Sequence, residues 1–279
     1  MKLSEEKTEE INRLCNRFRR DVLTVLHEKQ SGHIGGSFSA CEILATLYLA
    51  EMNVKTENIS DPDRDRLVLC KGHAAPMLYR VLAEIGLFPI SEMDTLRDID
   101  SRLQGHPCSL DTPGVEISSG PLGIGLSAAL GMALGLRLNN SPARVYAVLG
   151  DGELNEGTVW EACMSAYKYK ADNLCAVLDW NGVQLDGTAE EIMPMGDIRA
   201  KFTAFGWHCV ECRGHDPAAL CAAYDEARGF RGAPSVILAH TVKGKGVSFM
   251  EGKNIWHGKA INDGEFENAM RELEAPKYA

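Results

Sequence analysis

The sequence of 279 residues lacks both a long hydrophobic run and a block of basic residues. Its longest apolar stretch, residues 122–136, is broken by four glycines and a serine and is shorter than the roughly 20 residues that span a bilayer. Lys and Arg total 29 against 39 Asp and Glu, a net charge of −10, which argues against nucleic-acid binding. The charged N-terminus does not resemble a signal peptide. We therefore expect a cytoplasmic protein that engages neither membrane nor nucleic acid.

The nine cysteines form no disulfide framework, and a chain of this length needs none. One pair, Cys209 and Cys212, has the C-x-x-C spacing of some metal and redox sites, with His208 and His215 nearby. The run around Trp207 is typical of a short strand, on which residues three apart point to opposite faces. A metal site at this pair is therefore the less favoured interpretation.

Hydrophobic periodicity predicts strands that alternate with helices. The predicted strands are residues 67–70, 145–149, 174–178, a run near 207, and 235–239, and the predicted helices are 4–28 (capped by Ser4), 41–51, 159–169 and 217–229. This alternation predicts an α/β fold, a doubly wound parallel sheet with helices on both faces. Ligands of such sheets bind outside the carboxyl ends of the strands.

Polar residues follow two of these strands where a ligand would bind. Asp151 lies between Gly150 and Gly152 after the 145–149 strand, and Asn181 follows the 174–178 strand. The separation of 30 residues corresponds to one strand–helix–strand unit, so adjacent strands would bring a carboxylate and an amide oxygen together. Such oxygens, with a phosphate, suit Mg²⁺ or Ca²⁺. The GDG motif with an Asn about 30 residues later is the signature of thiamine diphosphate sites.

The longer string GDGELNEGTVWEA at residues 150–162 resembles the transketolases. Five more segments resemble motifs of that family in the same order: GHIGGSFSACEIL at 32–44, LCKGHAAPMLY at 69–79, QGHP at 104–107, SSGPLGIGLSAALGMALG at 118–135 and KGKGVSFMEGKNIWHG at 243–258. The first of these segments departs from the family at Ile34, where many transketolases have proline. The resemblance covers nearly the whole chain.

The resemblance implies that residues 1–279 form one thiamine diphosphate-binding domain, with an N-terminal helix at about 4–28 and a C-terminal tail at about 260–279. Transketolases normally continue through a pyrimidine-binding domain and a third, C-terminal domain. The chain is thus similar to the N-terminal subunit of a split transketolase, whose partner chain supplies those domains, in an expected α2β2 heterotetramer. The implied reaction moves a two-carbon ketol unit between sugar phosphates, as in the pentose phosphate pathway, and requires both chains.

The resemblance also implies roles for individual residues. The metal, Mg²⁺ or Ca²⁺, would be held by Asp151, Asn181 and the carbonyl group of Val183. Proton transfer would involve His33, His73, His106 and His257, because imidazoles ordinarily titrate near neutral pH. Residues expected to contact the cofactor are His73, Gly120, Pro121, Leu122, Gly152, Glu153, Glu156, Asn181, Leu185, Lys243 and His257. No role is expected for His27, His208, His215 and His240.

Three alternatives stay open at this stage. The chain could serve a split transketolase for an unusual sugar, such as a branched or sulfonated one. It could belong to another split thiamine diphosphate enzyme, such as the α subunit of a 2-oxoacid dehydrogenase, although the three histidine segments favour transketolase. It could also be a non-catalytic remnant that binds cofactor, which the intact metal and histidine positions argue against.

Overall fold

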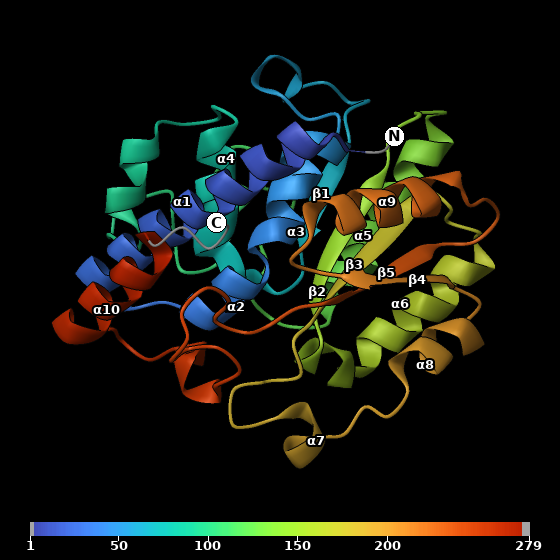
Figure 1. Ribbon diagram of the computed structural model, residues 1–279. Helices are drawn as coiled ribbons and strands as arrows, with labels where there is room; N and C mark the ends of the chain where they lie inside the picture. The colour runs from blue at the N-terminus through green and yellow to red at the C-terminus, as the bar shows by residue number, and fades with distance from the viewer. Residues whose placement is uncertain (1–2, 275–279) are drawn as a thin grey trace.

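A parallel five-stranded sheet forms the centre of the protein, seen in a computed structural model that describes residues 3–274 (Figure 1). The spatial order of the strands is β1-β2-β3-β5-β4, and every neighbouring pair is parallel. The strands are β1 (Arg66–Leu69), β2 (Val145–Gly150), β3 (Leu174–Trp180), β4 (His208–Arg213) and β5 (Ser235–His240). The predicted α/β fold is confirmed, and each predicted strand is found close to its expected position.

Alternating strand residues face two separate hydrophobic cores, as the pleat of a doubly covered sheet requires. Tyr146 and Val148 belong to one core, and Ala147 and Leu149 to the other. Helices that contribute to the first core are α1 (Glu5–Lys29), α2 (Ile34–Ser39), α3 (Cys41–Thr46), α4 (Ala75–Glu84), α9 (Pro217–Gly229) and α10 (Asp263–Glu274). Those of the second are α5 (Ile124–Leu138), α6 (Gly157–Lys168) and α8 (Ile198–Ala204).

The two ends of the described chain pack together. Helix α1 begins after Ser4, whose hydroxyl group accepts the N–H of Lys7 at 3.2 Å, as the predicted cap requires. Helix α10, within the segment expected as a C-terminal tail, lies beside α1 (Figure 1). Its Ala269 and Leu273 are buried in the first core. Residues 275–279 of that segment lie outside the described part of the chain.

The helix predicted over residues 41–51 changes form partway along. Helix α3 ends at Thr46, and Leu47–Glu51 continue as a π-helical turn that closes when the N–H of Met52 donates to the carbonyl of Leu47 at 2.8 Å. The Thr46 hydroxyl group donates to the carbonyl of Glu42 at 2.7 Å. This side-chain bond competes for an acceptor of the helix and accompanies the wider turn.

The C-x-x-C pair lies on β4, and its two cysteines pack against opposite cores, Cys209 against the second and Cys212 against the first. The predicted orientation of the two cysteines toward opposite faces is therefore confirmed. Across residues 3–274, the structure contains no helix with both the length and the apolar character needed to traverse a bilayer.

Candidate functional site

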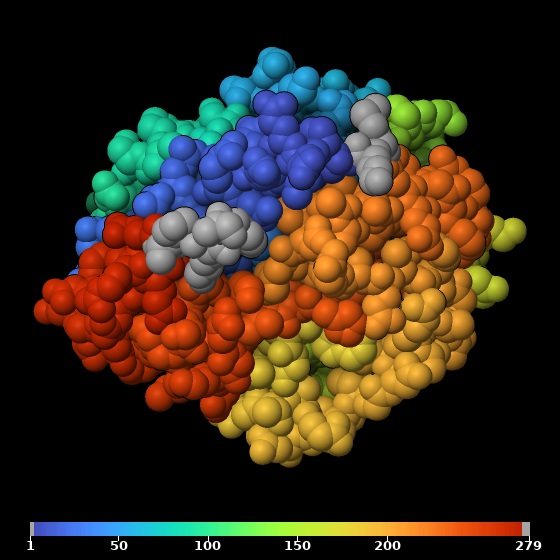
Figure 2. Space-filling model, in the orientation of Figure 1, coloured from blue at the N-terminus to red at the C-terminus, as the bar shows by residue number. Residues whose placement is uncertain are grey.

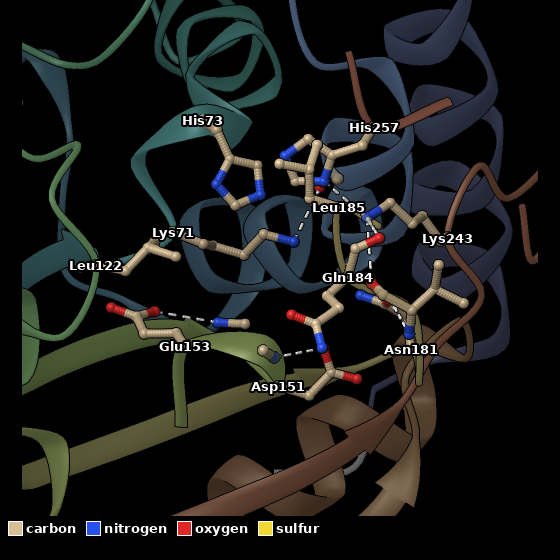
Figure 3. A pocket seen from close by; sticks show the side chains of 14 residues that line it. Lys71, His73, Leu122, Asp151, Glu153, Asn181, Gln184, Leu185, Lys243 and His257 are labelled. Carbon is tan, nitrogen blue, oxygen red and sulfur yellow. Dashed lines mark hydrogen bonds between the residues drawn. The ribbon is translucent and has the colours of Figure 1, made fainter. Parts of the chain in front are cut away.

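A cavity of about 180 Å³ lies at the carboxyl ends of β2 and β3. Asp151 directly follows β2 and Asn181 directly follows β3, so the predicted meeting of these two residues is observed (Figure 3). Figure 2 shows a hollow in the molecular surface between the chain around α7 (Ala189–Ile192), in gold, and the orange chain that follows β5. Ten predicted site residues line the cavity: His73, Leu122, Asp151, Gly152, Glu153, Asn181, Val183, Leu185, Lys243 and His257.

The carboxylate of Asp151 is held by two backbone N–H groups. One of its oxygens accepts the N–H of Gly152 at 2.8 Å, and the other accepts that of Gly182. Gly182 has a φ of 73°, which glycine adopts without strain. Burial and repulsion from Asp179 raise the pKa of Asp151, and the two backbone bonds limit that rise. The carboxylate is thus fixed next to Asn181, whose side-chain oxygen accepts the N–H of Val183 at 3.1 Å.

A buried ion pair that the sequence did not reveal lies beneath the cavity. Lys71 pairs with Asp179, and its ammonium group also donates to the carbonyl of Gly36 at 3.1 Å. The hydroxyl groups of Ser39 and Thr241 donate to the same carboxylate. Burial alone would raise the pKa of Asp179, but Lys71 and the hydroxyl groups hold it below its ordinary value. Lys71 therefore places a fixed positive charge at the cavity wall.

Lys243 brings a second ammonium group to the opposite wall. Its Nζ donates to the carbonyl of Val183 at 3.1 Å and lies 2.9 Å from Nδ1 of His257. Burial and repulsion from Lys71 lower the pKa of Lys243 to about 8, while Asp151 and Asp179 oppose that shift. This end of the cavity thus combines two ammonium groups with the carboxylates of Asp151 and Asp179.

The four predicted catalytic histidines form one group, although they come from distant parts of the chain. The ring centre of His33 lies 5.4 Å from His73, 6.0 Å from His106 and 5.2 Å from His257. The rings of His73 and His257 are 5.0 Å apart. His73 and His257 line the cavity, and His33 and His106 extend the group beyond its lining.

Burial and nearby cations lower the pKa of every ring in this group. The pKa of His33 falls to about 4, chiefly through burial and then Arg97, and that of His257 to about 3, through burial and Lys243. The pKa values of His73 and His106 are lowered for similar reasons. The expectation that these imidazoles titrate near neutral pH is therefore wrong for the chain alone. The rings are neutral at pH 7 but weakly basic.

Arg97 is a further residue near the histidines that the sequence did not indicate. Its positive charge lowers the pKa values of both His33 and His106. Its Nε atom is buried and has no hydrogen-bond partner within residues 3–274. A Cβ atom at Gly105 would lie 2.6 Å from Cζ of Arg97, so only glycine leaves room for the guanidinium group beside His106. The QGHP motif is the signal that could have indicated this contact.

Besides His33 and His106, three predicted site residues do not line the cavity: Gly120, Pro121 and Glu156. A Cβ atom on Gly120, whose φ is 158°, would lie 3.3 Å from the ring of His106, so its backbone borders the histidine group. Glu153 accepts the N–H of Gly123 at 2.8 Å, which connects the 120–123 loop to the end of β2. Burial raises the pKa of Glu153 to about 7.

The four histidines that were given no role have other partners. His27 contacts Asp263 at 2.9 Å, His208 stacks on Phe230, and His240 stacks on Trp180. His215 contacts Glu42 at 2.7 Å. Among the residues that line the cavity, none of these four occurs.

The cavity fits a diphosphate with a divalent metal. Two lysines line it, and Asp151 and Asn181 provide the oxygen ligands that Mg²⁺ and Ca²⁺ prefer. The side-chain nitrogen of Gln184, another lining residue, is buried without a partner in the described chain. A Cβ atom at Gly36 would lie 3.0 Å from the ring of His73, so glycine keeps this wall open.

Comparison with known proteins identifies the family. The model of the family described as "Transketolase, thiamine diphosphate binding domain" matches residues 11–276. The 6-deoxy-6-sulfo-D-fructose transketolase subunit SqwG of Clostridium sp. (strain MSTE9) is 40% identical over 269 residues, which cover 96% of this chain and 98% of that relative. An apulose-4-phosphate transketolase subunit of Phocaeicola vulgatus is 36% identical over 255 residues, or 91% of this chain and 90% of the relative.

The fold agrees with this assignment. Transketolase from Leishmania mexicana superimposes with a TM-score of 0.86 at 28% identity, covering 94% of this chain and 41% of that one. The chain thus spans less than half of the Leishmania protein but nearly the whole length of the two bacterial relatives. The chain therefore belongs to the transketolase family of transferases and forms its thiamine diphosphate-binding domain.

Proposed function

We propose that this chain is one subunit of a two-chain transketolase that transfers a two-carbon ketol unit from a ketose phosphate to an aldose phosphate. The observation that carries the proposal is the convergence of Asp151, Asn181, two lysines, His73 and His257 at one cavity, with His33 and His106 beside them. Its relatives of matching length are transketolase subunits, which supports a second chain as partner. We assign the enzyme to the cytoplasm and, with a ketose phosphate and an aldose phosphate as its substrates, to the pentose phosphate pathway.

In this proposal the charged end of the cavity, formed by Lys71, Asp151, Asp179 and Lys243, holds the cofactor. Asp151, Asn181 and the carbonyl of Val183 would hold Mg²⁺, or Ca²⁺, which would help to bind the diphosphate of thiamine diphosphate. When bound, the thiazolium ring of the cofactor stabilises the carbanion that ketol transfer requires. The remaining contacts to the cofactor come from His73, Gly120, Pro121, Leu122, Gly152, Glu153, Glu156, Leu185, Lys243 and His257.

The histidine group handles protons on the sugar. Ketol transfer breaks a carbon–carbon bond beside a hydroxyl group, which must lose its proton. His33, His106 and His257 face the sugar, and one of these neutral rings accepts the hydrogen bond of that hydroxyl group. A bound diphosphate would offset the positive charges of Lys71 and Lys243. The pKa values of His73 and His257 would therefore rise toward the ordinary value of histidine.

The partner chain supplies the pyrimidine-binding and C-terminal domains, and the active assembly is an α2β2 heterotetramer. Exposed apolar side chains on the outer side of α5 and α6 support a covered surface there, among them Ile124, Leu138 and Met164. The surface of α5 is also open at Gly131 and Gly135, because a Cβ atom at either position would meet no other atom within 4 Å. We expect the purified chain alone to show no ketol transfer.

The test begins with binding of thiamine diphosphate to the two-chain enzyme at increasing Mg²⁺. Asp151→Asn removes a charged metal ligand at constant volume, so we expect Mg²⁺-dependent affinity to fall by about 10–100-fold or more. Asp94→Asn, at an exposed position of the 3-10 helix Ile90–Thr95, is the matched control and should leave affinity unchanged. Unaltered metal dependence in Asp151→Asn would refute the metal assignment, and ketol transfer by the isolated chain would refute the need for a partner.

A sulfonated or branched sugar is the second candidate for the substrate. The two relatives of matching length are named for 6-deoxy-6-sulfo-D-fructose and apulose-4-phosphate. Assays of the two-chain enzyme with fructose 6-phosphate and with those two compounds as donors distinguish the candidates by the ratio of their kcat/KM values.

A further inference from the structure

His215 connects a buried carboxylate to the chain segment that enters the cavity. Its Nδ1 lies 2.7 Å from a carboxylate oxygen of Glu42, and its Nε2 accepts the backbone N–H of Val242 at 2.8 Å. An amide N–H can only donate, so Nε2 is the acceptor and the ring proton sits on Nδ1, facing Glu42. The side chain of His215 is 16% exposed. The contacts at both nitrogens thus define one tautomer and one ring orientation.

The carboxylate at the other end of this connection is firmly anchored. Arg19 of α1 donates to Glu42 at 2.6 Å and to the carbonyl of Phe38 at 3.0 Å. Burial alone would raise the pKa of Glu42, but Arg19 and His215 hold it far below its ordinary value. Arg19 and Glu42 are 3% and 5% exposed. The anchor is therefore an ionised pair shielded from solvent, which strengthens its hydrogen bonds.

Val242 lies between two residues that contact the site. Thr241 donates its hydroxyl proton to Asp179, the partner of Lys71. Lys243 enters the cavity, where its ammonium group donates to the carbonyl of Val183 at 3.1 Å. This segment follows the end of β5, and the acceptor of the Val242 amide is the ring of His215 rather than a neighbouring strand. The orientation of Lys243 therefore depends on a bond made outside the sheet.

We infer that His215 is a positioning residue: it holds the segment 241–243 so that Lys243 enters the cavity in one orientation. The inference rests on the proposed function, in which Lys243 contacts the diphosphate. His215 itself does not line the cavity and touches neither cofactor nor sugar. Its influence passes through one backbone hydrogen bond.

Two substitutions separate this role from a merely structural one. In His215→Gln the side-chain oxygen reaches the position of Nε2 and can accept the Val242 N–H. In His215→Asn the side-chain nitrogen replaces Nδ1 and can donate to Glu42, but the side chain is too short to reach Val242. We expect amide hydrogen exchange across 241–244 in the full chain to be about tenfold faster in His215→Asn, the equivalent of one hydrogen bond. His215→Gln and the control His208→Asn should exchange at the wild-type rate.

Binding to the two-chain enzyme gives the second readout. We expect thiamine diphosphate with Mg²⁺ to bind about tenfold more weakly to His215→Asn, again the equivalent of one hydrogen bond, and within a factor of about two of wild type in His215→Gln. Because the effect passes through Lys243, adding His215→Asn to Lys243→Met should weaken binding no further. His215→Ala repeats the cycle if circular dichroism shows that His215→Asn does not fold.

The outcomes are distinguishable. The inference would be overturned if the amides exchanged at equal rates in His215→Gln and His215→Asn, or if the rate in His215→Asn were the closer to wild type. In either case His215 would serve only Glu42. Additive losses with Lys243→Met would also overturn it. If the exchange pattern appears but the wild-type enzyme does not bind Mg²⁺ and thiamine diphosphate, the proposed function fails while the positioning of the segment stands.

Discussion

The two ends of the cavity differ in how far this chain satisfies them. At the charged end, formed by Lys71, Asp151, Asp179 and Lys243, every one of these groups has hydrogen-bond partners from the chain itself. At the histidine end, formed by His33, His73, His106, His257 and Arg97, the Nδ1 of His33 and the Nε of Arg97 are buried without partners in the described residues. The charged end is therefore preorganised, whereas the histidine end has buried donors and acceptors that these residues leave unsatisfied.

The largest effect should come from breaking the charged end. Lys71→Met leaves the carboxylate of Asp179, which is fully buried, without its cation. Removing one partner of a buried ion pair typically costs about 3–5 kcal/mol, so we expect the free energy of unfolding to fall by that amount in urea titrations of the isolated chain.

The double variant Lys71→Met with Asp179→Asn is the control for this prediction. It removes the uncompensated charge, so it should recover part of the lost stability. If Lys71→Met alone unfolds at the wild-type urea concentration, the charged end is not held by this pair and the contrast between the two ends disappears.

At the histidine end the expected pattern is reversed. His33→Ala removes a ring whose Nδ1 has no partner within the described chain, so stability should change by no more than about 1 kcal/mol. Loss of a proton-handling group costs about 10²-fold or more in rate, and we expect that loss in the kcat of the two-chain enzyme with cofactor affinity unchanged. The control His240→Ala, on a half-exposed ring stacked on Trp180, should keep full activity. A stability loss without a rate loss would place His33 with the structural residues.

The same contrast explains what the sequence could predict. The strands and the pair Asp151 and Asn181 were found because apolar runs mark strand positions and parallel strands end at one edge. The pairing of Lys71 with Asp179, 108 residues away, has no local signature. It depends on three segments meeting in space, and a lysine beside a histidine motif did not indicate it.

Arg97 and His215 were missed for related reasons. Arg97 adopts a φ of 65° and reaches the histidines past Gly105, a path set by the loop rather than by any periodic pattern. His215 was expected to be without a role, as is usual for an isolated histidine, and its contacts with Glu42 and Val242 cross between distant segments. The sequence thus indicated which residue types meet at the site, but not the groups that hold them there.

Changing the pH should affect the stability of the folded chain through the histidine end, but less than the substitutions above. His33 and His257 have pKa values of about 4 and 3 in the folded chain, against an ordinary value of about 6.5. As pH falls below about 6.5, the unfolded state binds protons that the folded state does not, so the free energy of unfolding falls toward pH 4. We expect the Tm of the isolated chain to drop less between pH 7 and 5 in His33→Asn than in wild type. Equal drops would show that His33 is not held neutral by its surroundings.

The smallest effect should come from Arg97, because its charge is only the second cause of the low pKa of His33, after burial. Arg97→Met removes a cation near both His33 and His106 without opening the loop to solvent. NMR titration of the isolated chain should therefore show both pKa values rising part of the way toward the ordinary value. Arg102→Met, which removes an arginine already paired with Glu92 at 2.7 Å, should leave both unchanged. If Arg97→Met also leaves them unchanged, burial alone keeps the histidine end neutral, and the charge of Arg97 has no part in setting the protonation of the rings.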